Sequence, residues 1–293
     1  MENEYQSKIQ NAQKRLETYM MHLHIRTVFL DSQENKLCIE LVKPTKEIKN
    51  QILEIVGDSD LYYIVEREEY LITFDPIQES SKVSNQLKSI GSGPFYMRDG
   101  GKIVANNLPL SLTCGVLKMD GSNGVLTANH YPNLYQVPFY YEEGGQQYYI
   151  GKATQVSNTN EWDFAYIARE NQDAHMFGAS LDGTQCAGIA YGAAVNQEIW
   201  MNGSVTYSAR GNVISNNASG IFNYPDGRSF QMNDLILTTC GADHGDSGGP
   251  AFISSEGTNY LVGSVLGGVP YEKCYFIKLY KILQHINGSL FKF

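Results

Sequence analysis

A serine set among glycines is the residue of this sequence whose surroundings most clearly indicate chemistry. Ser247 lies in the run Gly245-Asp246-Ser247-Gly248-Gly249-Pro250. Glycines on both sides allow a tight turn, and successive N–H groups in such a turn can point into one cavity and bind an anion. Acyl transfer needs this combination, a hydroxyl nucleophile beside donors for the developing oxyanion. A flexible turn between two strands is the alternative interpretation.

A nucleophilic serine needs a base, and His130 is the best placed of the six histidines. It ends the strand-like segment Leu126-Thr127-Ala128-Asn129-His130, and a neutral imidazole is a natural base near pH 7. His244 lies three residues before Ser247, where we expect it to line a substrate cleft. The remaining histidines lie in segments without a motif: His22, His24, His175 and His285.

Asp163 is the predicted third member of the set. It opens the alternating strand Asp163-Phe164-Ala165-Tyr166-Ile167, between His130 and Ser247 in the sequence. A buried carboxylate on the far imidazole nitrogen would fix the tautomer and stabilise the imidazolium. The rivals Asp173 and Asp182 are not followed by an alternating apolar strand.

These three segments resemble those of the chymotrypsin-like (trypsin-like) serine peptidases, in the same His, Asp, Ser order. The resemblance covers about residues 100–293 and is strongest to the bacterial streptogrisin and α-lytic branch. It implies two six-stranded antiparallel β-barrels with a C-terminal helix, and a serine endopeptidase that works through an acyl-enzyme without a metal or organic cofactor. The N–H groups of Gly245 and Ser247 would form the oxyanion hole.

The resemblance also assigns residues to substrate binding. Gly267 and Gly268 follow Leu266 at the end of a strand, where the family pairs extended substrate backbone. Asp243 and His244 would shape the primary pocket, where Asp243 would favour a basic substrate side chain and His244 an acidic one.

Two cysteines lie where the relatives carry a disulfide across the primary pocket. These are Cys240, just before the serine run, and Cys274, so the resemblance implies a disulfide between them. The sequence has five cysteines at wide spacing, which by themselves form neither a disulfide framework nor a zinc pattern.

The region near Met201 departs from the family pattern. The bacterial branch usually has an arginine near Met201 that pairs with the aspartate before the serine, here Asp246. A buried aspartate without a partner would be costly. We therefore expect another cation, either a new amino terminus at Ile103 released by cleavage after Lys102, or one of the arginines Arg210 and Arg228.

The elements that must position these residues fall into two parts. About half of the charged side chains lie in residues 1–98, the first third of the chain. Residues 4–21 and the segment after Thr45 indicate helices, and 25–30, 36–42, 61–65 and 70–74 indicate strands, which together predict a small α+β domain. Residues 99–293 contain short strands separated by turns, with a last helix at 279–286, and predict the peptidase domain.

The N-terminal domain has two interpretations. It is either a pro-segment that inhibits the second domain or helps it to fold, acting on it in cis as in a zymogen, or a plain accessory domain. The function of the whole chain likewise has an alternative, a peptidase-like binding module that has lost turnover. The expected partner in both cases is a protein or peptide.

Composition excludes several other classes. The net charge of −9 argues against a nucleic-acid partner, and no run approaches the roughly 20 apolar residues of a membrane helix. The polar opening Met1-Glu2-Asn3-Glu4-Tyr5-Gln6 does not resemble a secretory signal. The compartment is therefore undetermined: cytoplasmic if the sequence is complete, secreted if a leader precedes it.

Overall fold

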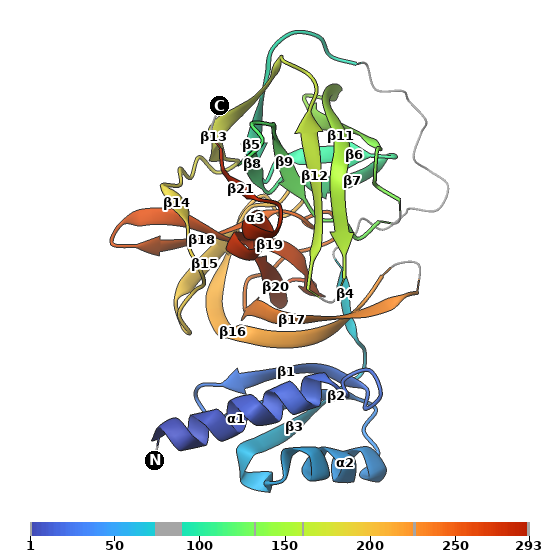
Figure 1. The fold of residues 1–293 in the computed structure, drawn as a ribbon, viewed down its shortest axis with the longest axis vertical. Helices are drawn as coiled ribbons and strands as arrows, with labels where there is room; N and C mark the ends of the chain where they lie inside the picture. The colour runs from blue at the N-terminus through green and yellow to red at the C-terminus, as the bar shows by residue number, and fades with distance from the viewer. Residues whose placement is uncertain (1, 74–89, 132, 160, 225–226, 292–293) are drawn as a thin grey trace.

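The computed structural model describes residues 2–73, 90–131, 133–159, 161–224 and 227–291. An N-terminal unit lies at one end of the molecule, against a much larger β-rich part (Figure 1). The chain is mostly β-structure and ends in two antiparallel barrels with a helix after the second, as the sequence predicted. The predicted strand at 70–74 is observed as β4 (Leu71–Thr73), and residue 74 lies outside the described residues.

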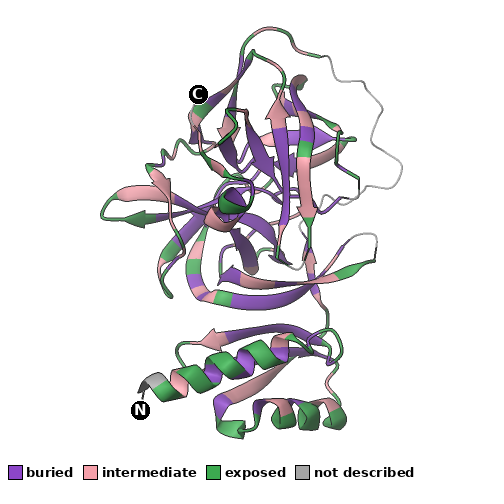
Figure 2. Cartoon of the chain, in the orientation of Figure 1, coloured by how far each residue is buried: buried purple, intermediate pink, exposed green. Residues whose placement is uncertain are grey.

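The N-terminal unit, residues 2–67, packs helices on a small sheet. Its elements are α1 (Glu2–Glu17), β1 (Ile25–Asp31), β2 (Lys36–Val42), α2 (Lys46–Val56), a 3-10 turn (Ser59–Leu61) and β3 (Tyr62–Arg67). The hydroxyl of Thr45 accepts a hydrogen bond of 3.2 Å from the N–H of Ile48 and caps α2, and Gly57 ends the helix at φ 82°. Apolar side chains such as Leu16 and Ile52 are buried between the layers, while the outer helix faces are exposed (Figure 2).

The sheet of the N-terminal unit continues into the β-rich part. Strand β1 pairs antiparallel with β16 (Ala209–Asn223), with Thr27 opposite Gly220 and Val28 opposite Ser219. The resulting strand order is β15-β18-β19-β20-β17-β16-β1-β2-β3. The two parts therefore share backbone hydrogen bonds as well as side-chain contacts.

The first barrel contains the strands in the order β21-β8-β9-β12-β11-β10-β6-β7. Apolar side chains such as Phe139, Ile150 and Ile167 fill its interior. The bounds are β6 (Lys102–Ala105), β7 (Leu108–Ser111), β8 (Cys114–Lys118), β9 (Asn123–Thr127), β10 (Pro138–Glu143), β11 (Gln146–Asn158), β12 (Asp163–Arg169) and β21 (Gly288–Leu290).

The second barrel is built on the long hairpin of β16 and β17. Helix α3 (Leu279–His285) follows it, buries Leu279, Ile282 and Leu283, and leads to β21 in the first barrel. The other bounds are β14 (Gly188–Ile189), β15 (Glu198–Met201), β17 (Ser229–Thr238), β18 (Pro250–Ser255), β19 (Thr258–Val269) and β20 (Lys273–Lys278).

The division between the two parts lies earlier than the expected 98/99. Strand β5 (Phe95–Asp99) pairs in parallel with β13 (Ala174–Ser180), and Phe95 and Met97 are buried in the core of the first barrel. The physical reason is that the glycines around position 100 form a turn within the barrel, not a linker before it. The β-rich part therefore includes residues from at least 90, where Ile90 bridges Gln147.

Candidate active site

Three elements bring His130, Asp163 and Ser247 together. His130 follows the end of β9, and Asp163 is the first residue of β12. These strands are antiparallel neighbours, with Thr127 opposite Ala165, so the end of one lies beside the start of the other. Ser247 lies in the loop between β17 and β18 of the second barrel, so the three side chains meet where the barrels face each other.

The side-chain contacts follow the predicted order. The Nε2 atom of His130 lies 2.9 Å from the hydroxyl oxygen of Ser247, and its Nδ1 atom contacts a carboxylate oxygen of Asp163. The other oxygen of Asp163 accepts a hydrogen bond of 3.1 Å from the N–H of Asn129. With a proton on Nδ1, Nε2 is free to accept the serine proton. This arrangement can activate the hydroxyl for attack on an acyl group.

The glycines of the serine run are required by close contacts. Gly245 and Gly248 have φ values of +99° and +84°, which side chains rarely tolerate. A Cβ atom on Gly248 would lie 2.5 Å from the carbonyl oxygen of Ser111, and one on Gly249 would lie 2.3 Å from that of Asn202. The run is therefore a tightly packed turn, not a flexible linker.

The site is covered by the chain itself. His130, Asp163 and Ser247 are all buried. The ring of Tyr224, at the tip of the β16–β17 hairpin, lies 6.3 Å from the His130 ring. Sequence reasoning did not find Tyr224, because its place over the histidine depends on how the hairpin folds.

Strand β4 lies on the edge that the sequence analysis assigned to substrate backbone. It pairs antiparallel with β19, with Thr73 opposite Gly267 and Ile72 opposite Gly268. On its other side it pairs in parallel with β16, with Ile72 opposite Asn223. Leu266, just before the two glycines, is buried. Residues 71–73 thus occupy this edge of β19.

Asp243 and His244 precede the serine turn, and the side chain of Asp243 is hydrogen-bonded on both oxygens. One carboxylate oxygen accepts a hydrogen bond of 2.7 Å from the N–H of His244, and the other accepts from the hydroxyl of Tyr271. This contact raises the pKa of Tyr271. The N–H of Tyr271 also donates to Ala242 at 3.0 Å. Tyr271 therefore joins the two segments expected to wall the primary pocket, a role that no sequence motif signalled.

The structure does not contain the predicted disulfide between Cys240 and Cys274, because both residues are free thiols. The sulfur of Cys240 donates to the carbonyl oxygen of Ala209 at 3.2 Å, and that of Cys274 lies 3.8 Å from the carbonyl of Tyr275. Burial raises the pKa of both thiols, for Cys240 to about 12. The contacts of Tyr271 with Ala242 and Asp243 hold together the segments that the predicted disulfide would have joined.

The cations expected to pair with Asp246 are occupied elsewhere. Arg210 pairs with Glu198, and Arg228 lies over the ring of Tyr224 at 4.7 Å. Ile103 is buried in β6, which is paired on both sides by β7 and β10. Lys102 donates to Glu142 at 2.8 Å. Asp246 is instead held by peptide N–H and hydroxyl groups.

In the part of the chain that the structure describes, no three histidine, cysteine, aspartate or glutamate side chains come together in a way that could hold a metal ion. Across the same residues, every helix is too short or too polar to pass through a bilayer.

Comparison with solved structures identifies the fold of the chain. No family model matches the sequence, and no curated protein matches it. Among solved structures, a glutamic-acid-specific serine protease that uses a histidine triad in substrate binding aligns with a TM-score of 0.55 and 24% identity, covering 67% of this chain and 100% of its own. The chain has the chymotrypsin-like fold.

Two other solved protease structures also align with this chain over the same share of its length. Protease A of Thermobifida fusca aligns with a TM-score of 0.54 and 17% identity, over 68% of this chain and 100% of its own. An α-lytic protease homologue, N4, aligns with a TM-score of 0.53 and 20% identity, over 67% of this chain and 100% of its own. The structural neighbours are thus bacterial serine proteases of this fold, and the predicted resemblance is confirmed at the level of fold.

Proposed function

We propose that this protein is a serine endopeptidase. The observation that supports it is the buried chain of contacts from Asp163 through His130 to Ser247, with 2.9 Å between the imidazole Nε2 and the hydroxyl oxygen. Each of the three residues was selected from the sequence by its own segment, and the fold brings all three into contact. The substrates are proteins or peptides.

Each step of the reaction has a residue in place. The hydroxyl of Ser247 attacks the peptide carbonyl while His130 takes its proton, and Asp163 stabilises the imidazolium that forms. The N–H groups of Gly245 and Ser247 bind the oxyanion. His130 then passes its proton to the departing amine, which leaves an acyl-enzyme. The same imidazole removes a proton from the water that releases the acyl group.

The N-terminal unit is proposed to keep the enzyme latent in cis. Peptide substrates would have to pair with Gly267 and Gly268, and β4 occupies that edge. Ser247 is buried at the same time. Strand β4 follows directly on the N-terminal unit, whose β1 is anchored on β16. A substrate can therefore bind only after β4 has left, which makes residues 1–73 an inhibitory segment and the β-rich part the peptidase.

An organofluorophosphonate probe tests the proposed chemistry. It phosphonylates a serine only where a base activates the hydroxyl. Wild-type protein that has been incubated until its hydrolysis of denatured casein is constant should therefore be labelled at Ser247 and lose that activity. Ser247→Ala and His130→Ala should abolish labelling, whereas Ser289→Ala, at an exposed serine, should leave it unchanged. If neither the incubated wild type nor the Ile72→Pro variant, in which β4 is displaced, is labelled, the protein is instead a silent peptidase-like binding module.

A further inference from the structure

The carboxylate of Asp246, next to Ser247, is fully buried and hydrogen-bonded on both oxygens. Oδ1 accepts from the backbone N–H groups of Val205 and Thr206, each at 3.0 Å. Oδ2 accepts from the N–H of Asp243 at 3.0 Å and from the hydroxyl of Thr206. Several charge-assisted bonds of this kind can compensate a carboxylate for its lost hydration without a cation.

The segment Gly203–Thr206 is shaped for this carboxylate. A Cβ atom on Gly203 would lie 2.1 Å from Oδ1 of Asp246, so any other residue would displace the carboxylate. A Cβ atom on Gly245 would lie 2.7 Å from a methyl group of Val205. The 203–206 segment and the serine loop, residues 243–247, therefore fit closely against each other.

The same segment also holds the peptide between Gly245 and Asp246. The carbonyl oxygen of Gly245 accepts from the hydroxyl of Ser204 at 2.9 Å and from that of Ser111 at 2.9 Å. The N–H of Ser204 in turn donates to the hydroxyl of Ser111 at 2.8 Å. The serine loop is thus fixed by the side chain of Asp246 and by the backbone carbonyl of Gly245, the two residues directly before Ser247.

We propose that Thr206 is a positioning residue for the oxyanion hole, and that the 203–206 segment holds the serine loop in working geometry with uncharged donors. Thr206 is the member of the segment that reaches both oxygens of Asp246, one with its N–H and one with its hydroxyl. Fixing Asp246 fixes the backbone between the N–H groups of Gly245 and Ser247. This inference rests on the proposed peptidase function, and adds that the loop needs no new amino terminus at Ile103.

The test compares Thr206→Val, which keeps the N–H and the size but loses the hydroxyl, with Thr206→Ser, which keeps the hydroxyl. The full chain is incubated until casein hydrolysis is constant, and active sites are counted by organofluorophosphonate labelling. In Thr206→Val, kcat per labelled site should fall about 10- to 100-fold, as expected for a lost donor to a charged group, with KM within about twofold. Thr206→Ser should recover most of the loss. Ser208→Ala, at an exposed hydroxyl near Asp182, is the matched control.

Several outcomes would overturn the inference. A purely structural hydroxyl would lower the number of labelled sites but leave kcat per site unchanged. Equal losses of kcat per labelled site in Thr206→Val and Thr206→Ser would also exclude a positioning role for the hydroxyl. If Thr206→Val does not fold, Thr206→Ala takes its place in the comparison. A labelled wild-type species that begins at Ile103 would overturn the statement about the amino terminus. A wild type that is never labelled would instead refute the proposed function itself.

Discussion

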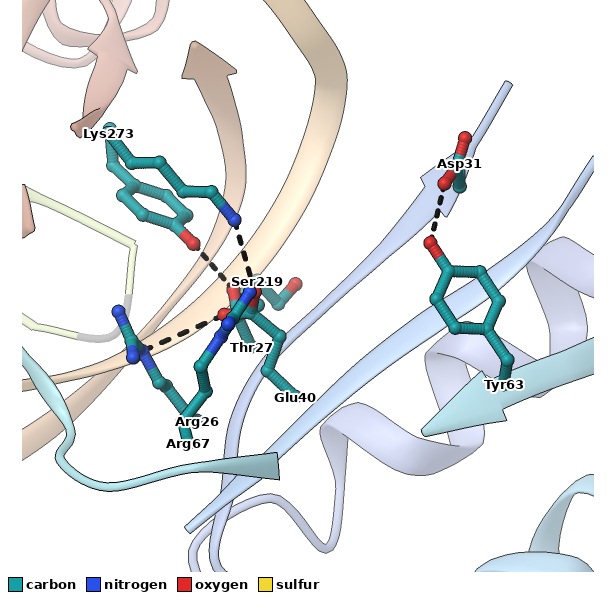
Figure 3. Close-up of polar contacts among 9 residues, drawn as sticks. Arg26, Thr27, Asp31, Glu40, Tyr63, Arg67, Ser219 and Lys273 are labelled. Atoms are coloured by element: carbon teal, nitrogen blue, oxygen red, sulfur yellow. Dashed lines mark hydrogen bonds and ion pairs between the residues drawn. The ribbon is translucent and has the colours of Figure 1, made fainter. Parts of the chain in front are cut away.

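The carboxylate of Glu40 accepts a hydrogen bond of 3.1 Å from the ammonium group of Lys273, and so joins β2 of the N-terminal unit to β20 of the second barrel (Figure 3). Glu40 is buried, also accepts from Arg67 at 2.7 Å, and lies 3.7 Å from Arg26. Lys273 lies opposite Val269 of β19, the residue after Gly268. One acidic side chain thus links the N-terminal unit to β20, which neighbours β19, a strand with which β4 pairs.

Glu40→Gln should loosen this interface. The substitution removes the carboxylate that Lys273, Arg67 and Arg26 share in the described part of the chain, and breaking a buried ion pair by changing one partner costs about 3–5 kcal/mol. We expect a lower free energy of unfolding in urea and faster cleavage of the N-terminal unit by an added protease. Glu66→Gln, in the exposed pair with Lys49, is the control and should change the unfolding free energy by less than about 1 kcal/mol. Equal effects of the two substitutions would contradict the role of Glu40.

The interface should also weaken in acid. Burial by itself would raise the pKa of Glu40, but Lys273, then the hydrogen bond from Arg67, and then Arg26 outweigh it and leave the pKa below 4.5. A carboxyl whose pKa is lower in the folded state stabilises that state above pH 4.5, and the contribution is lost as the pH falls through the folded-state pKa. Unfolding free energies measured from pH about 6 to about 3 should fall less steeply for Glu40→Gln than for the wild type. Parallel curves would show that other carboxyl groups dominate.

Local sequence pointed to the three residues that the structure brings together, His130, Asp163 and Ser247, because each carries its own context. His130 ends a strand, Asp163 begins one, and Ser247 lies among glycines whose φ values and close contacts exclude other residues. The helices and strands of the N-terminal unit follow from hydrophobic spacing and from caps such as Thr45. The caps, the glycines and the hydrophobic spacing all lie within a few residues of the positions whose structure they determine.

The contacts that cover and support the site could not be predicted in this way, because they join residues far apart in sequence. Thr206 meets Asp246 across 40 positions, and Thr73 meets Gly267 across far more. Nothing in the short run Leu71–Thr73 indicates which edge it joins. The disulfide prediction failed for another reason: it was carried over from relatives, whereas the residues here place the sulfur of Cys240 against the carbonyl of Ala209.

The five thiols give a direct chemical prediction. All five cysteines are buried, and burial raises the pKa of Cys240 to about 12 and of Cys38 to about 11. Iodoacetamide should therefore react slowly with the native protein, since the thiolate is the reactive form. After unfolding in guanidinium without reductant, mass spectrometry should show five carbamidomethyl groups. Three groups would mean that one disulfide forms, and the pair could be identified from tryptic peptides.

Displacing β4 should release the latent activity. Ile72 lies in a strand paired on both sides, so a proline there removes a backbone donor whichever neighbour the N–H faces and breaks the pairing. We expect Ile72→Pro to hydrolyse denatured casein at once after purification, while the wild type shows a lag until its N-terminal unit is removed. Ile72→Val keeps the N–H and a β-branched side chain, and should retain the lag. The strand would not be inhibitory if wild type, Ile72→Pro and Ile72→Val all hydrolysed casein without a lag, at equal rates per site labelled by the organofluorophosphonate.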